Sequence, residues 1–159
     1  MIISAYDRIE DIRSLFSEYT DMLVSINPEF HLYLDIQHYD DEKENPSLKY
    51  ALPDGRLYLD ISDDGIARGC IALRKLSDEK GEVKRLYVRP EYRGNGIATA
   101  LVERIIEDAR DIGYKELYLD TLPELESAVR LYKAFGFEET GQYNDSPVDK
   151  TIFKKLSLI

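Results

Sequence analysis

The feature that most constrains the fold is a pair of glycines, Gly94 and Gly96, between a strand pattern and a helix pattern. Upstream, residues 82–88 form a short run typical of a β-strand that follows a tight turn. Downstream, apolar residues recur every three or four positions over 97–112, which is typical of an amphipathic helix. Because glycine adopts backbone conformations closed to other residues, this segment predicts a strand, a tight turn and a helix in immediate succession.

The other elements surround this unit in an order that excludes a regular βαβ repeat. Two helical patterns come first and three strands joined by tight turns follow; after the glycine turn come a helix, a strand, a helix and two strands. A mixed α/β (α+β) sheet in one domain, residues 1–159, accommodates that order. We expect helices at 7–26, 28–43, 97–112 and 124–135, strands at 57–61, 67–75, 82–88, 116–120, 137–140 and 151–156, and a polar surface connection at 40–46.

Composition narrows the class of protein. Hydrophobic residues make up 43 % of the chain, which is enough for a core, and no apolar run approaches the ~18 residues of a membrane span. We therefore expect a soluble, cytoplasmic protein with no membrane partner. The formal net charge of −10 disfavours binding to nucleic acid. That charge either attracts a small cationic amine or serves only solubility.

One cysteine and two histidines leave few ways to build a thiol or metal site. Cys70 has no partner for an internal disulfide, and a catalytic thiol would need a histidine beside it. His31 and His38 lie in an early helical segment, with no third ligand at zinc-like spacing. We expect Cys70 to be a small buried strand residue, and we expect no metal site.

The turn at residues 93–98 has the chemistry of a phosphate cradle. The start of a helix leaves several backbone N–H groups unpaired and carries a partial positive charge. Gly94 and Gly96 allow phosphate oxygens to approach that backbone, and Arg93 adds a cation suited to phosphate. The alternative is an ordinary tight turn whose glycines only relieve strain.

Two common phosphate-binding motifs fit this turn poorly. The dinucleotide fingerprint Gly-x-Gly-x-x-Gly/Ala matches Gly94 and Gly96, but its third position is Thr99 and the preceding strands are antiparallel. Asp120 lies near the distance at which a ribose-binding acid occurs, so that match has some support. A Walker A loop is excluded because no Gly-Lys-Ser/Thr follows the turn.

Three motifs in order carry a resemblance to GNAT-type N-acetyltransferases. Residues 93–98 are similar to the family's acetyl-CoA signature, Arg/Gln-x-x-Gly-x-Gly/Ala. Residues 85–90 resemble its fourth strand, and Leu131-Tyr132 followed by Gly136-Phe137 resembles its C-terminal helix motif. The resemblance covers residues 82–137. It implies a GNAT-like fold, which is a mostly antiparallel, splayed sheet of six to seven strands flanked by about four helices.

The same resemblance implies that the chain binds acetyl-CoA and acetylates an amine. Backbone groups at Leu86, Tyr87 and Val88 would meet the pantetheine arm, and the Val88 N–H would stabilise the oxyanion. The family often has an asparagine three residues before an alanine of the last helix, and this chain has Leu125 there. The pyrophosphate would lie on Arg93, Gly94, Asn95, Gly96, Ile97 and Ala98.

Acetyl transfer needs a group that takes the amine's proton and a group that protonates the leaving thiolate. By resemblance Tyr132 occupies the general-acid position; the alternative is a core aromatic on the apolar face of its helix. Glu82 occupies the register where several relatives place a general base; the alternative is an exposed glutamate at a strand edge. The absence of a Cys–His pair favours direct transfer in a ternary complex.

The acceptor pocket should lie between the N-terminal helices and the loop before the last strand. Its candidate residues are Phe30, Tyr33, Tyr143, Asn144 and Asp145, with a solvated loop as the alternative. We expect a small-molecule amine, although the sequence leaves a protein amine open. The alternative to an enzyme is a non-catalytic acyl-CoA-binding sensor module. The family resemblance is compatible with a homodimer.

Overall fold

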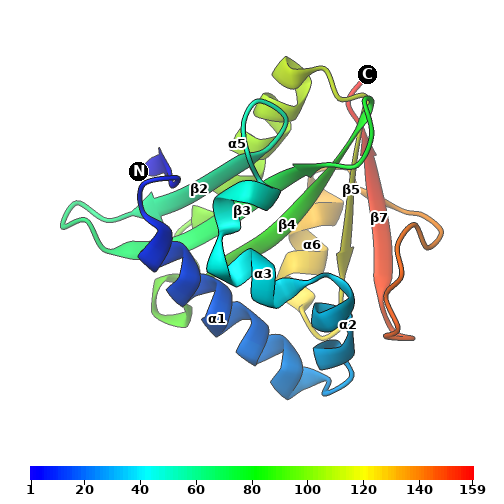
Figure 1. Ribbon diagram of the computed structural model, residues 1–159. Helices are drawn as coiled ribbons and strands as arrows, with labels where there is room; N and C mark the ends of the chain where they lie inside the picture. The colour runs from blue at the N-terminus through cyan, green and yellow to red at the C-terminus, as the bar shows by residue number, and fades with distance from the viewer.

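A seven-stranded sheet organises the computed structural model, which describes residues 1–159 (Figure 1). The strand order is β1-β2-β3-β4-β5-β7-β6, and only the β4–β5 pair is parallel. The strands are β1 (Ile2–Ser4), β2 (Arg56–Ile61), β3 (Ala67–Lys75), β4 (Lys80–Val88), β5 (Glu116–Thr121), β6 (Glu138–Glu139) and β7 (Ile152–Ser157).

Helices cover both faces of this sheet. In Figure 1, α1 and the short helices that follow it lie in front of the strands, and α5 and α6 lie behind them. Phe16 and Tyr50 belong to the core in front, and Leu101 and Ile105 belong to the core behind. None of the helices combines the length and apolarity that crossing a membrane requires. The helices are α1 (Ile9–Ile26), α2 (Phe30–Ile36), α3 (Tyr39–Glu44), α4 (Pro46–Lys49), the 3₁₀ helix Pro90–Tyr92, α5 (Ile97–Ile112) and α6 (Glu126–Ala134).

Strands β4 and β5 separate soon after they meet. They pair only over Lys80–Glu82 and Glu116–Tyr118, and in Figure 1 they diverge from that point downward. Strands that stay paired lie about 4.8 Å apart and leave no room between them. The separation therefore opens the middle of the sheet. Lys84 and Asp120, each two residues past the last pair, face this opening from opposite strands.

A β-bulge in β4 changes which side chains face the helices in front. Between the paired positions of Lys84 and Tyr87, β3 contributes one residue, Ile71, and β4 contributes two, Arg85 and Leu86. Arg85 has a φ of 59°, which non-glycine residues rarely adopt. Simple alternation would turn Arg85 toward α5. The bulge instead turns it to the same side as Lys84, where both side chains bond to Gln37.

The mostly antiparallel sheet expected from the resemblance is confirmed, and the differences lie at element boundaries. Strand β1 was not expected; it pairs with β2. The helix predicted over 28–43 divides into α2 and α3 at His38, whose φ is 57°. The connection predicted at 40–46 is largely helical, in α3 and the start of α4. These breaks give six α-helices where about four were expected.

A buried ion pair holds the short helices against the bulge. Glu42 of α3 accepts hydrogen bonds from Arg85 Nε at 2.7 Å and from Arg85 Nη2 at 3.0 Å. Lys49 Nζ also donates to Glu42, at 2.7 Å. Burial alone would raise the pKa of Glu42, but the charges and hydrogen bonds of Arg85 and Lys49 outweigh it and lower the pKa to about 2. Folding therefore favours the ionised carboxylate.

Glu42→Gln is expected to lower the free energy of unfolding at pH 7 by about 3–5 kcal/mol, because it leaves the buried Arg85 without its counter-ion. A carboxyl whose folded pKa is lowered stabilises the protein above its unfolded pKa, near 4.5, and loses this effect as pH falls toward 2. Urea unfolding of both proteins should therefore converge between pH 4.5 and pH 2. Glu44→Gln, at an exposed position two residues on, is the control and should change stability little. A constant difference across this pH range would contradict the assignment.

Candidate active site

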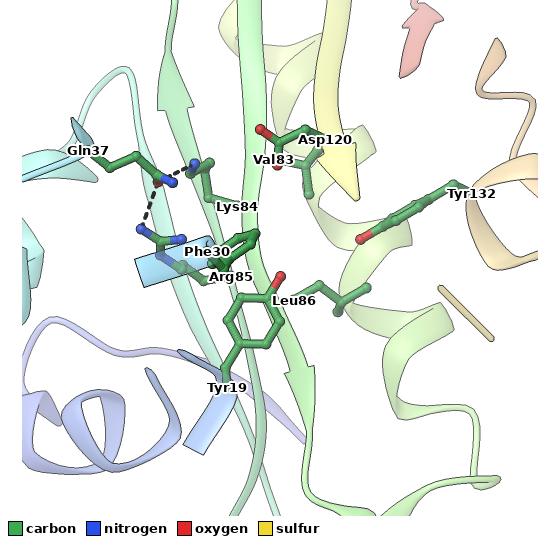
Figure 2. Close-up of a pocket in the computed structure, with 9 residues that line it drawn as sticks. All are labelled: Tyr19, Phe30, Gln37, Val83, Lys84, Arg85, Leu86, Asp120 and Tyr132. Carbon is green, nitrogen blue, oxygen red and sulfur yellow. Dashed lines mark hydrogen bonds between the residues drawn. The ribbon is translucent and has the colours of Figure 1, made fainter. Parts of the chain in front are cut away.

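A cleft opens where β4 and β5 separate, and Figure 2 shows the side chains that line it. They come from α1, α2, the residue after α2, β4, β5 and α6. Three of the residues expected at the site are among them: Leu86 for the coenzyme, Phe30 for the acceptor and Tyr132 for proton donation. The cleft is lined by Tyr19, Phe30, Gln37, Val83, Lys84, Arg85, Leu86, Asp120 and Tyr132.

Tyr132 of α6 directs its hydroxyl into the cleft (Figure 2). The residue is 6 % exposed, and its ring packs edge-on against Phe137 at 5.6 Å between ring centres. Burial, together with nearby Tyr19 and Asp120, raises the pKa of Tyr132 well above its ordinary value. The phenol therefore stays protonated at neutral pH and is available as a proton donor. Tyr132 is thus both a packed aromatic and a cleft residue, so the two interpretations of it are compatible.

Asp120 of β5 joins two segments that lie far apart in the sequence. Tyr33 of α2 donates its hydroxyl proton to Asp120 Oδ2. Asn144, in the loop before β7, donates from Nδ2 to the same oxygen at 2.7 Å. Burial and the neighbouring carboxylate raise the pKa of Tyr33 well above its ordinary value, so the phenol remains a donor. The network holds α2 and the loop against β5, and Asp120 Oδ1 has no hydrogen bond within the protein.

The opposite side of the cleft carries two cations. Lys84 Nζ donates to Gln37 Oε1 at 2.7 Å, and Arg85 Nη2 donates to the same oxygen at 3.0 Å (Figure 2). Arg85 is neutralised by Glu42. Lys84 is 7 % exposed and forms no salt bridge. Burial lowers the pKa of Lys84 from its ordinary value.

Glu82 lies beside the cleft and is not part of its lining. The residue is 3 % exposed, so the alternative of an exposed strand-edge glutamate is wrong. Its Oε2 accepts a hydrogen bond from the Tyr143 hydroxyl at 2.5 Å, and its Oε1 lies 3.4 Å from Arg74 Nε. Glu82 is the last residue of β4 that pairs with β5. A proton from the cleft would therefore need an intermediary, such as one water, to reach this carboxylate.

The expected phosphate cradle forms the start of α5. Gly94 and Gly96 have φ values of 82° and 76°, in the left-handed region that favours glycine. Apart from its two chain neighbours, a Cβ at either position would meet no protein atom within 4 Å, so the space beside the turn is open. No side chain caps α5. The backbone N–H groups of its first turn, beginning at Ile97 and Ala98, are therefore available to an anion.

The polar side chains of this turn brace its backbone. Arg93 Nε donates to the Val88 carbonyl at 2.8 Å, and its guanidinium lies 5.7 Å from the centre of the Tyr87 ring. Asn95 Nδ2 donates to the Tyr92 carbonyl at 3.0 Å. These contacts connect the turn to the end of β4, so the strand expected to meet the pantetheine arm leads directly into the cradle.

The structure brings four of the five acceptor candidates to the cleft or beside it. Phe30 lines the cleft, and Tyr33, Tyr143 and Asn144 hold the two carboxylates already described. Asp145 is exposed on the same loop and makes no such contact, so the structure does not bring it to the cleft. As expected, Cys70 is fully buried in β3. No group of three or more His, Cys, Asp or Glu side chains is arranged to hold a metal ion.

Sequence reasoning missed four polar residues of the cleft: Tyr19, Gln37, Lys84 and Arg85. It had considered Asp120 only as a ribose-binding acid. The sequence carries a signal for Lys84 and Asp120. Both are polar residues within expected strands, where side chains alternate between the two faces of the sheet. No such signal exists for Arg85, since its orientation depends on the bulge.

Comparison with known proteins shows which family this chain belongs to. Residues 12–137 match the model of the acetyltransferase (GNAT) family. The chain belongs to the GNAT family. It is an acetyl-CoA-dependent N-acetyltransferase, as the matched family and its relatives indicate.

Relatives of this GNAT enzyme extend over nearly its whole length. An uncharacterized N-acetyltransferase of Schizosaccharomyces pombe is 38 % identical over 151 residues, covering 94 % of this chain and 88 % of the relative. A GNAT-family acetyltransferase of Staphylococcus aureus superposes with a TM-score of 0.78 at 24 % identity, over 100 % of this chain and 99 % of the other. The PaiA N-acetyltransferase of Thermoplasma acidophilum, solved with coenzyme A, gives a TM-score of 0.77 at 17 % identity, over 99 % and 98 %. At these identities the two structures support the fold alone.

Proposed function

We propose that this GNAT enzyme transfers the acetyl group of acetyl-CoA to a primary amine of a small molecule, directly, within a ternary complex. The observation that carries the proposal is the path of the β4 backbone, which leads from the cleft that holds the Tyr132 hydroxyl to the open turn at Gly94 and Gly96. An anion at the start of α5 and an acyl group between the separated strands would use both ends of this path.

In the proposed reaction the neutral amine nitrogen attacks the thioester carbonyl. A C–N bond forms, the carbonyl oxygen carries the negative charge of the tetrahedral intermediate, and the C–S bond then breaks. The Val88 N–H is the proposed donor to the oxyanion. Tyr132 protonates the departing thiolate, and the resulting phenolate regains a proton from solvent as Glu82 releases the one it has taken. Glu82 takes the proton lost by the amine, through a water because it lies behind the lining of the cleft.

Direct transfer also fits the state of Cys70. Its thiol is fully buried and donates to the Arg85 carbonyl at 3.2 Å, and burial raises its pKa from the ordinary value. A thiol in this state is a poor nucleophile. In the proposed reaction Cys70 therefore does not carry the acetyl group.

The proposal is tested by thiol release from acetyl-CoA over a panel of amines, with both substrates varied. Direct transfer predicts intersecting initial-velocity lines and no acetyl adduct in the intact mass of the enzyme incubated with acetyl-CoA alone. Parallel lines with a trapped acetyl-enzyme would contradict it. Tight acetyl-CoA binding without thiol release on any amine would favour the non-catalytic acyl-CoA-binding module. Light scattering on the same preparation tests the homodimer that the resemblance suggests.

A valine at Gly96 tests the proposed pyrophosphate site. Gly96→Val places a branched side chain in the open space of the turn, and we expect acetyl-CoA affinity to fall by about 100-fold or more. Gly65→Val is the matched control, because Gly65 also has a positive φ, 80°, and equally open surroundings, but lies in the β2–β3 turn. Both variants should lose about 1–2 kcal/mol of stability through the left-handed backbone. Equal acetyl-CoA affinity in both, measured by calorimetry, would remove this turn from the binding site.

A further inference from the structure

The cleft contains one cation and one anion that lack an ion-pair partner. Other charges around it are paired: Arg85 and Lys49 with Glu42, and Arg74 with Glu82. Lys84 and Asp120 form no salt bridge, either with each other or with a third residue. Since the two lie on separated strands, each two residues beyond the last paired position, they face the same space from opposite sides.

Lys84 presents unused hydrogen-bond donors. An ammonium has three donors, and Lys84 Nζ uses one, in its bond to Gln37 Oε1. The ammonium also lies 5.8 Å from the centre of the Tyr33 ring, an attraction that involves the ring face and provides no acceptor atom. A buried ammonium is costly unless charged or polar groups compensate for the lost water. The carboxylates of Glu82 and Asp120 act on this charge only from beyond ion-pair distance, so the arrangement favours an anionic group in direct contact with Lys84.

Gln37 adds a second donor at the same place. Its Oε1 accepts hydrogen bonds from both Lys84 and Arg85, which fixes the orientation of the amide, since Nε2 could not accept from either cation. Nε2 is buried and has no hydrogen-bond partner in the protein. A buried amide donor without an acceptor is uncommon and destabilising. An oxygen-rich anion on Lys84 would satisfy it.

Asp120 offers the complementary charge. Both of its protein hydrogen bonds, from Tyr33 and Asn144, reach Oδ2, and Oδ1 is free to accept from a ligand. The Tyr132 hydroxyl and the β4 strand border the same space (Figure 2). An amine held by Asp120 would lie between the strands, where the acetyl group is proposed to arrive.

We propose that the acceptor is a small zwitterion, an amino acid or an amino acid derivative with a free carboxylate, whose carboxylate binds Lys84 and Gln37 and whose amine binds Asp120. This inference rests on the acetyl transfer proposed above and specifies its substrate class. A polyamine would place a further cation against Lys84 and is disfavoured. A lysine side chain within a protein would leave Lys84 without an anion.

Matched acceptors test this inference. Thiol release is measured for L-phenylalanine, L-histidine and L-lysine, each beside its decarboxylated amine and its carboxamide. The carboxylate acceptor of a preferred pair should have a kcat/KM about 10- to 100-fold higher, mainly through KM, as expected for a charge-assisted contact. Lys84→Met, similar in volume, should reduce that ratio toward 1. Lys80→Met, at an exposed position earlier on β4, is the control and should preserve it.

Calorimetry separates failure of this inference from failure of acetyl transfer. The same acceptors are titrated into the complex with coenzyme A, which cannot transfer an acetyl group, and melting temperatures confirm that each variant folds. Tighter binding of the carboxylate acceptors, lost in Lys84→Met, supports the zwitterion even if turnover fails. Equal binding and equal turnover within every pair, or a ratio unchanged in folded Lys84→Met, would overturn it. Thiol release from amines of both kinds alike would leave acetyl transfer intact.

Discussion

Tyr132→Phe is expected to lower kcat by about 100-fold or more while the dissociation constant for acetyl-CoA changes by less than about threefold. The phenylalanine keeps the ring, which packs against Phe137 at 5.6 Å, so the fold and the cleft should persist. What disappears is the hydroxyl, which forms no hydrogen bond within the protein and faces the cleft. A loss confined to turnover would therefore report the proton delivered to the departing thiolate.

The measurement is steady-state thiol release with calorimetric titration of acetyl-CoA. Because burial raises the pKa of Tyr132 well above its ordinary value, the wild-type enzyme should keep its turnover through the mildly alkaline range. Tyr114→Phe is the control for hydroxyl removal. The Tyr114 hydroxyl lies outside the cleft and donates a hydrogen bond to the Asp54 carbonyl at 2.7 Å. Tyr19→Phe, on the facing wall, tests the neighbouring phenol. An unchanged kcat in Tyr132→Phe would exclude it as the acid, and a larger loss in Tyr19→Phe would transfer that role.

Glu82→Gln is expected to lower kcat by about 10²- to 10⁴-fold if Glu82 is the general base. Glutamine keeps the shape and can still accept the Tyr143 hydrogen bond, which measures 2.5 Å in the native protein. The change removes only the charge and the capacity to take a proton. The acceptor's KM should change little, because Glu82 does not line the cleft.

Asp120→Asn is the informative comparison, since Asp120 lines the cleft and is the only carboxylate that does. If Asp120 holds the amine, its replacement should act mainly on the acceptor's KM. Tyr143→Phe, which keeps the Glu82 carboxylate but removes its hydrogen bond, controls for a purely structural effect. A larger fall in kcat for Asp120→Asn than for Glu82→Gln would assign the base to Asp120 and leave Glu82 a structural role.

The glycine turn at residues 93–98 illustrates a local feature that sequence can predict. This feature depends on neighbouring residues only. It consists of glycines at positions 94 and 96, a strand before them and a helix with periodic apolar residues after them. The observed φ values, the uncapped start of α5 and the empty space beside both glycines agree with that prediction. The divided helix around His38 shows the opposite case, because apolar spacing alone carries no signal for the single left-handed residue that breaks it.

The side of the cleft proposed to hold the acceptor depends on contacts between distant segments. Tyr33 and Asn144 are 111 residues apart, and they meet only because α2 and the loop before β7 pack on the same strand. Both are acceptor candidates in the sequence, but nothing in the chain indicates Asp120 as their shared partner. Likewise, Glu82 was expected at a site, and its burial behind the lining follows from the length of the β4–β5 pairing.

The sequence by itself determined the family, the mixed sheet, the glycine turn at the start of α5 and the position of Tyr132, because these depend on local periodicity and short motifs. Only the tertiary structure decided which charges meet in the cleft. A one-residue bulge turns Arg85 to the same face as Lys84, and three paired positions between β4 and β5 set where the strands separate. Bulges and pairing lengths arise from the balance of packing across the whole sheet, and no local pattern encodes that balance.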